Sequence, residues 1–163
     1  MRYGLVGSEM CIRDRVIKFR EIEASNTKND LFDNLDKLDS FKVNLERISK
    51  DHRAQIEEDI KSKIDNLNLE LDYGRIEQEL FYYLEKIDIN EEIVRLNSHL
   101  KFFSDVLNNN EVEKGKKLGF ICQEIGREIN TIGSKANNSS IQSNVVEMKT
   151  LLEKLKEQSL NIL

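Results

Sequence analysis

The 163-residue chain contains no proline, no tryptophan, only two cysteines and only seven glycines. Two cysteines cannot form a disulfide framework, and because no secretory signal pattern is present we expect a protein of the reducing cytoplasm. No apolar run approaches the roughly 18 residues that a membrane span needs, which excludes an integral membrane protein. The chain is 39% hydrophobic and 34% charged, a composition typical of helical proteins with long solvated faces and not of compact β-sandwiches.

Several common signatures of catalytic chemistry are also missing. A glycine-rich phosphate loop is absent, because the stretch Gly115-Lys116-Lys117 has no upstream glycine at the required spacing. The chain has no cysteine pair for zinc and no H-E-x-x-H sequence. Ser134 lacks the surroundings of a catalytic nucleophile.

Residues 1–15 differ in pattern from the rest of the chain. They read MRYGLVGSEMCIRDR, and a DNA string resembling the read-end adapter of a transposase-based sequencing library translates as Leu5 through Asp14 without a mismatch. We therefore expect residues 1–15 to be a non-native leader that packs little, with the native reading frame truncated near Val16. Without their three arginines and two acidic residues, 22 basic and 28 acidic residues remain, and Cys122 is the remaining native cysteine.

The first half of the chain carries a long apolar stripe. Its members recur every 3.6 residues on average, which is the period of a straight α-helix: Leu31, Leu35, Leu38, Phe41, Leu45, Ile48, His52, Ile56, Ile60, Ile64 and Leu67. We expect residues 16–70 to form one long amphipathic helix, or a helix pair with a break near Ser49–Asp51.

Residues 71–163 predict shorter helices, over about 75–86, 89–107 and 115–132, and a last helix beyond a loop at 137–140. The last helix places its apolar residues on one face: Ile141, Val145, Met148, Leu152 and Leu155. No segment alternates convincingly with period two. The predicted fold is therefore all-α, a bundle or hairpin of amphipathic helices.

Helix ends are marked by short polar signals. Asp88 with Glu91, and Ser139 with Gln142, have the spacing of capping boxes. Gly133 is a candidate stop for the helix that begins near 115.

The helix over 115–132 has one apolar face, which we expect to be buried: Leu118, Ile121, Cys122, Ile125, Ile129 and Ile132. On the polar side, Glu124 and Glu128 lie one turn apart and could hold a divalent cation. Arg127 and Lys135 could neutralise a phosphate. The alternative is a solvated helix face without chemistry.

The helix over 89–107 offers a second polar row. Glu92, Arg95 and His99 are spaced at i, i+3 and i+7, so they point the same way. His99 could serve as a general acid or base, or as a metal ligand; the alternative is a surface or half-buried histidine without chemistry. Packing explains His52 on the apolar stripe and Cys122 on the core side.

A first segment begins with RIEQEL at 75–80 and continues with Asp88, Glu91, Glu92, Arg95, Leu96 and His99. This segment resembles the YicC-like family. GKKLGFICQEIGREINTIGSKAN at 115–137 resembles that family's most recognisable block. VVEMKTLLEKLKEQSLNI at 145–162 is similar to its C-terminal helix. Residues 71–163 are thus identified as similar to the C-terminal, helical domain of the family.

The resemblance implies a bacterial endoribonuclease that cuts single-stranded RNA, small regulatory RNAs in particular, with a divalent cation, Mg²⁺ or Mn²⁺. It also implies a ring-like homo-oligomer, a hexamer, and a separate N-terminal α/β domain that we expect to have been lost at the junction near Val16. The family motif itself assigns no roles to the polar residues that match it. From the groups that phosphodiester cleavage needs, we expect the catalytic residues to be Glu92, His99, Glu124, Arg127 and Glu128. We expect Glu124 and Glu128 to be the metal ligands, and Arg75, Lys116, Lys117, Arg127 and Lys135 to bind RNA.

Two positions depart from the family pattern. Gly119 stands where an acidic residue is usual, and Gly126 stands where Asn is usual. Each glycine weakens a helix by roughly 1 kcal/mol relative to Ala. A lost metal- or RNA-binding side chain at either position would reduce activity.

Two functions stay open, one implied by the family resemblance and one favoured by the composition. The first is the metal-dependent endoribonuclease, in which basic residues between 114 and 135 offset the overall negative charge where RNA binds. Tyr82, Tyr83 and Phe120 could stack on bases, although core packing is the commoner role of such residues. The second is a non-catalytic helical oligomerisation or adaptor module that uses the long first helix to contact partner chains.

Overall fold

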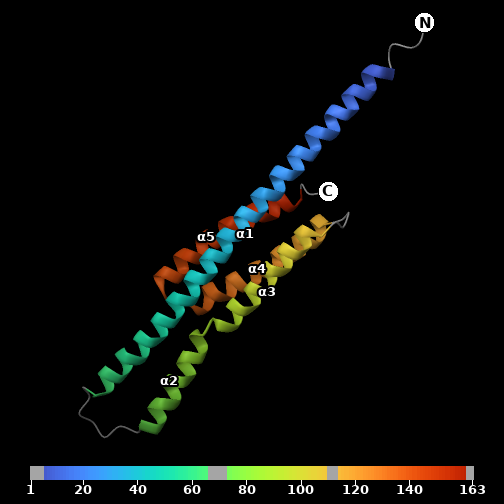
Figure 1. Ribbon diagram of the computed structural model, residues 1–163. Coiled ribbons are helices and arrows are strands. Elements are labelled where there is room, and N and C mark those ends of the chain that lie inside the picture. The colour runs from blue at the N-terminus through green and yellow to red at the C-terminus, as the bar shows by residue number, and fades with distance from the viewer. Residues whose placement is uncertain (1–5, 66–72, 110–113, 161–163) are drawn as a thin grey trace.

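The computed structural model describes residues 6–65, 73–109 and 114–160, with side chains from residue 12 onward except at positions 21 and 65. These ranges form five helices and contain no strand, which confirms the all-α prediction. The helices are α1 (Val6–Asp65), α2 (Tyr73–Ile87), α3 (Asn90–Asn108), α4 (Lys114–Lys135) and α5 (Ser139–Ser159) (Figure 1). No helix in the described ranges is both long and apolar enough to cross a membrane.

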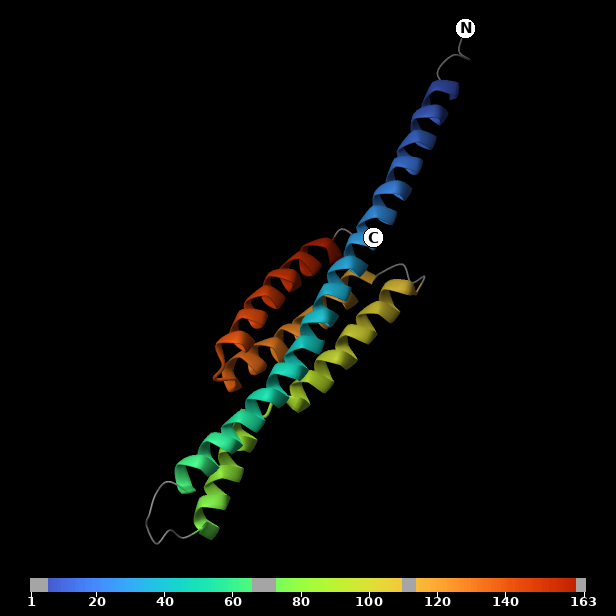
Figure 2. The same cartoon turned by 60° about the vertical axis from the view of Figure 1, so that its left-hand side comes forward.

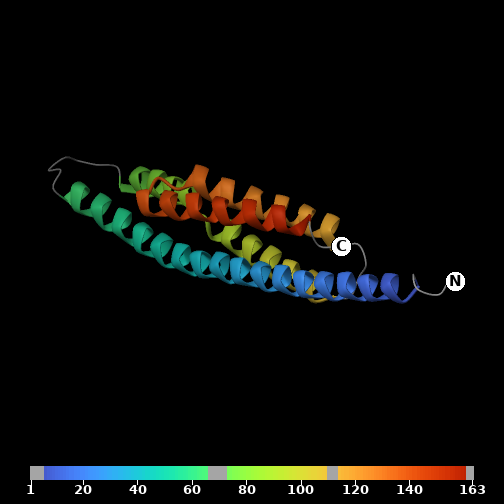
Figure 3. The same cartoon turned by 90° about the horizontal axis from the view of Figure 1, so that it is seen from above.

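Four of the helices build one bundle. α1 and α4 each pack against both α3 and α5, and Figure 3 shows α1 along one side of the molecule with α4 and α5 along the other. All the residues predicted for the apolar faces of the last two helices are buried. Burial of a Leu or Ile side chain contributes about 1.5–3 kcal/mol, which fixes the faces that α4 and α5 turn toward the core.

The apolar stripe of α1 enters the same core. Leu31, Leu35, Leu38 and Leu45 are buried, and Phe41 and Ile48 pack partly against them. α1 is a single helix with no break near 49–51, so the one-helix alternative holds. Residues 31–48 therefore share a core with α3, α4 and α5.

The two ends of α1 lie outside the bundle. Its N-terminal part projects beyond the other helices (Figure 1), and Ile12 and Phe19 expose 60% and 66% of their surfaces. The helix runs without a break across positions 15 and 16, whereas Leu5 and the side chain of Val6 lie outside the described residues. At the other end α2 lies beside the last turns of α1 (Figure 2).

The glycine stop at 133 and the capping box at 139–142 are corrected by the structure. α4 continues past Gly133 to Lys135. The glycine instead allows α5 to approach closely, since a Cβ at this position would lie 3.1 Å from Val145. Asn138, and not Ser139, caps α5 by accepting hydrogen bonds from two backbone N–H groups. Gln142 instead donates from Nε2 to the carbonyls of Gly133 and Ala136, which satisfies the end of α4.

The predicted capping box of α3 also differs. The N-cap of α3 is Ile89, which makes no side-chain cap hydrogen bond. Asp88 accepts a hydrogen bond from the backbone N–H of Asn90 at 2.8 Å and not from that of Glu91. The side chain of Glu91 forms an ion pair with Arg95, one turn along. The predicted capping box is therefore not formed at the start of α3.

Candidate functional site

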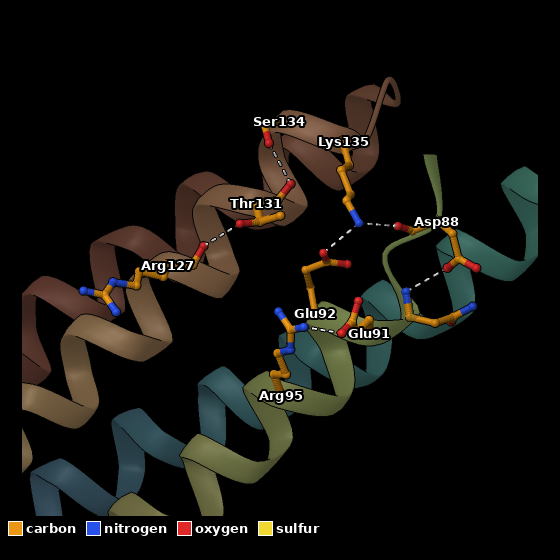
Figure 4. Close-up of polar contacts among 9 residues, drawn as sticks. Asp88, Glu91, Glu92, Arg95, Arg127, Thr131, Ser134 and Lys135 are labelled. Atoms are coloured by element: carbon orange, nitrogen blue, oxygen red, sulfur yellow. Dashed lines mark hydrogen bonds and ion pairs between the residues drawn. The ribbon is translucent and has the colours of Figure 1, made fainter. Parts of the chain in front are cut away.

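An ion pair joins the two predicted polar rows at one end of the α3–α4 hairpin. Nζ of Lys135, in the last turn of α4, lies 2.7 Å from Oε1 of Glu92, in the first turn of α3 (Figure 4). The same ammonium donates a hydrogen bond to the backbone carbonyl of Asp88 at 3.2 Å. Asp88 also accepts from Arg53 of α1, at 3.4 Å. Lys135 thus ties the end of α4 to the turn between α2 and α3.

Glu92 is a buried carboxylate. Only 3% of the residue is exposed, and its Oε2 atom is buried with no hydrogen-bond partner among the described residues. A buried charged group needs both an opposite charge and satisfied lone pairs, and here the second requirement is not met by the described residues. An unsatisfied buried group of this kind is explained by a bound water or ion, by a catalytic role, or by local strain.

His99 on α3 and Glu128 on α4 each lie seven residues, or about two turns, from the Glu92–Lys135 pair, and so at the same height along the hairpin. α3 and α4 run antiparallel, and each rises 1.5 Å per residue, so seven residues from the Glu92–Lys135 pair on each helix correspond to about 10 Å. Glu128 is 8% exposed and His99 is half-buried. The structure assigns no hydrogen bond or ion pair to either side chain within its described ranges. We call Glu92, His99, Glu128 and Lys135 the α3–α4 seam.

Glu124 and Arg127 form a separate, exposed pair. Nη1 of Arg127 lies 2.7 Å and 3.0 Å from the two carboxylate oxygens of Glu124. Their side chains are 71% and 41% exposed, for Arg127 and Glu124 respectively, and Figure 4 shows Arg127 pointing away from the Glu92–Lys135 pair. Glu124 precedes Lys135 by eleven residues, or roughly 16 Å along the helix. The predicted catalytic residues therefore form two groups. Glu92, His99 and Glu128 belong to the seam, whereas Glu124 and Arg127 form an exposed pair on α4.

Two carboxylates of α4, Glu124 and Glu128, are the predicted metal ligands. The described residues contain no group of three or more His, Cys, Asp or Glu side chains that could hold a metal ion. Glu124 is engaged by Arg127, and Glu128 is nearly buried. Glu124 and Glu128 therefore do not complete a metal site with the described side chains.

The predicted RNA-binding residues are spread over the length of the molecule. Lys116 and Lys117 lie in the first turn of α4, and the ammonium of Lys117 stands 5.7 Å from the ring centroid of Phe102. Lys135 lies nineteen residues further along α4, or roughly 28 Å away. Arg75 is exposed at the start of α2, beyond the bundle.

The three aromatic residues considered for base stacking are exposed and not packed in the core. Tyr82, Tyr83 and Phe120 expose 67%, 41% and 58% of their surfaces. The expectation that at least two of them pack in the core is therefore wrong. On α2, Leu84 takes the buried position instead.

The prediction that Cys122 packs in the core is confirmed. Cys122 is fully buried, and burial raises the pKa of its thiol from 9.0 to about 11, so it is not a reactive thiol. His52 is half-buried and lines a small pocket beside Arg53 and Asp88. Sequence reasoning missed Arg53, because its contact with Asp88 joins residues 35 positions apart.

Comparison with known proteins places this chain in a family. The family model described as "Endoribonuclease YicC-like, C-terminal" matches residues 41–163. A protein of Clostridioides difficile (strain 630) named "Probable endoribonuclease YicC" is 35% identical over 159 residues, covering 93% of this chain and 53% of that protein. One of the same name from Haemophilus influenzae is 34% identical over 129 residues, covering 77% of this chain and 45% of that protein. This chain spans about half the length of these curated relatives. It belongs to the YicC-like endoribonuclease family and matches that family's C-terminal domain.

Proposed function

We propose that this chain is the helical, C-terminal part of a cytoplasmic endoribonuclease that cleaves single-stranded RNA, small regulatory RNAs in particular. Glu92 carries the proposal: it is a buried carboxylate with one oxygen on Lys135 and the other without a described partner, on a hairpin of an endoribonuclease family. A purely structural ion pair would be better satisfied. The two relatives named as endoribonucleases support the same class of reaction.

The seam offers the groups that phosphodiester cleavage needs. The side chains of His99, Glu92 and Glu128 can accept a proton from the attacking oxygen or donate one to the leaving oxygen. Lys135 has three N–H donors, of which two are used by Glu92 and Asp88, so the third can donate to a phosphate oxygen. Arg127 is exposed on the same helix and can add a second positive charge where phosphate charge develops.

We also propose Mg²⁺ or Mn²⁺ as the cofactor. Such an ion would polarise a phosphate oxygen or a bound water. Mg²⁺ is commonly held by one or two carboxylates together with substrate phosphates, and Glu124 and Glu128 are the carboxylates proposed for this role. Because the described residues do not complete the site, no step of the cleavage is assigned to the metal.

The remaining parts of the proposal concern the whole protein. We propose an N-terminal α/β domain and a hexameric ring as the context in which this chain acts. The chain has a formal net charge of −5, which opposes RNA binding unless cations are concentrated locally. A ring would repeat the lysines at the start of α4 around one axis and provide that concentration.

A non-catalytic adaptor is the second candidate function, because α1 projects beyond the bundle with apolar residues exposed. Val16, Ile17, Phe19 and Ile22 are 45–66% exposed. An unpaired helix of this kind can bind partner chains. In that case RNA would be neither bound nor cut, and the seam would only stabilise the hairpin.

Cleavage of end-labelled RNA distinguishes the two candidates. The 163-residue chain and a full-length protein carrying it would be incubated with single-stranded RNA, duplex RNA or single-stranded DNA, with Mg²⁺, Mn²⁺ or EDTA. We expect the full-length protein to cut only single-stranded RNA and EDTA to stop the reaction. Absence of cleavage by both proteins under all conditions would favour the adaptor.

A further inference from the structure

An open groove lies between the first turns of α4 and the last turns of α5. Its volume is about 390 Å³, within the range of roughly 300–1,000 Å³ found for sites that hold small ligands. It is lined by Lys116, Gly119, Phe120 and Gln123 from α4 and by Lys156 and Leu160 from α5. No carboxylate is among the described residues that line it. The groove lies over the N-terminal half of α4, whereas the α3–α4 seam begins at Glu128 and reaches the C-terminal end of this helix.

The charges of the groove suit a phosphodiester. Lys116 is exposed, and the structure records no ion pair for it with another described residue. Lys156 contacts Glu153 at 2.7 Å, but its ammonium has two further N–H donors. Two cations on facing helices can contact successive phosphates of one strand, and phosphate contacts dominate affinity for nucleic acid.

The apolar part of the groove suits an unpaired base. Phe120 exposes 58% of its surface beside the two lysines, and an exposed aromatic ring next to a cationic groove is the usual stacking platform for single strands. Gln123 lies one turn along the same face of α4, and its amide can both donate to and accept from a base edge.

Gly119 gives the groove its depth. A Cβ built at this position meets no atom within 4 Å, so the space above the glycine is open. Gly126, two turns along, differs: a Cβ there would lie 3.2 Å from Leu152. Packing therefore accounts for Gly126, whereas no packing contact accounts for Gly119. A side chain at Gly119 would occupy the space beside Phe120.

We propose that this groove binds one unpaired nucleotide of single-stranded RNA, with its base on Phe120 and its flanking phosphates on Lys116 and Lys156. The inference rests on the proposed function for the choice of RNA, and it adds a substrate-holding subsite whose Phe120 lies eight residues, or roughly 12 Å, along α4 from Glu128 of the seam. In this proposal the groove holds the RNA strand, and the seam cleaves the phosphodiester bond.

Fluorescence anisotropy of a labelled oligouridylate tests the subsite. Gly119→Leu fills the groove while keeping every charge, Phe120→Ala removes the stacking ring, and Lys149→Gln is a charge control on the exposed face of α5. We expect the first two variants to bind about tenfold more weakly or worse, as for loss of one stacked base. Lys149→Gln should bind like the wild type, and circular dichroism should show that all variants are folded.

Four results are decisive for the subsite and for the proposed function. Wild-type affinity in both folded groove variants overturns the subsite, and if the wild type still cuts RNA the proposed function stands. If the groove variants bind more weakly but the wild type does not cleave RNA, the result supports the subsite and contradicts the proposed cleavage. A change of assembly mass in Phe120→Ala at unchanged affinity identifies a contact between chains and overturns the subsite. Failure of the wild type to bind RNA overturns it as well.

Discussion

Lys135 and Glu92 join the last turn of α4 to the first turn of α3 at 2.7 Å, with Lys135 one third exposed and Glu92 almost fully buried. Because the same ammonium holds the carbonyl of Asp88, one side chain connects α4, α3 and the turn that precedes α3. The pair fixes the level at which the two helices face each other. It therefore also fixes the level of His99 and Glu128.

Removal of Lys135 should destabilise the protein more than removal of a comparable surface lysine. Lys135→Met leaves a buried carboxylate without its counter-charge, and we expect a loss of about 3 kcal/mol, the lower end of the range for buried pairs, because Lys135 is partly solvated. Lys156→Met breaks a pair of the same 2.7 Å length at the surface and should cost at most about 1 kcal/mol. Urea unfolding measures both, and equal losses would show that Glu92 is not effectively buried.

Two glycines of α4 should respond differently to alanine. Gly119→Ala adds a methyl group to open space and should raise the free energy of unfolding by about 1 kcal/mol through helix propensity. Gly133→Ala places the methyl group 3.1 Å from Val145, so the contact should offset most of that gain. Thermal unfolding of both variants tests the difference, which disappears if α4 and α5 pack less closely than described.

Cys122 should make stability fall at alkaline pH. Its pKa is raised from 9.0 to about 11 by burial, so between these values the unfolded chain loses the thiol proton while the folded chain keeps it. The contribution is therefore complete below pH 9 and is lost as pH rises toward about 11. Cys122→Ala should show a shallower decline of unfolding free energy over this window than the wild type. Parallel declines would mean that the thiol is not buried in the native protein.

The helices and their buried faces could be predicted from the sequence because they depend on local periodicity. The stripe from Leu118 to Ile132 is buried as its spacing requires. The helix ends were less predictable. Gly133 reads as a stop in sequence, but its role is set by Val145 on another helix, and the partners of Gln142 lie on α4.

The candidate site was less predictable than the core, because its contacts join distant segments. Sequence spacing placed Glu92 and His99 on one face and Glu124 and Glu128 on another, but it could not show that Lys135 meets Glu92. Neither could it show that Glu124 is occupied by Arg127. The exposure of Phe120 beside Lys156 likewise depends on the way α5 packs on α4.

The most direct test of the account is RNA cleavage by full-length protein carrying Glu124→Gln or Glu128→Gln. Each change keeps the shape of the side chain and removes its charge, and Glu91→Gln, in the surface pair with Arg95, is the matched control. The account predicts that both α4 variants remain folded and oligomeric but lose cleavage by at least about a hundredfold, along with its stimulation by Mg²⁺ or Mn²⁺, while the control cuts normally. Retained, metal-stimulated cleavage by both α4 variants would place the active site elsewhere.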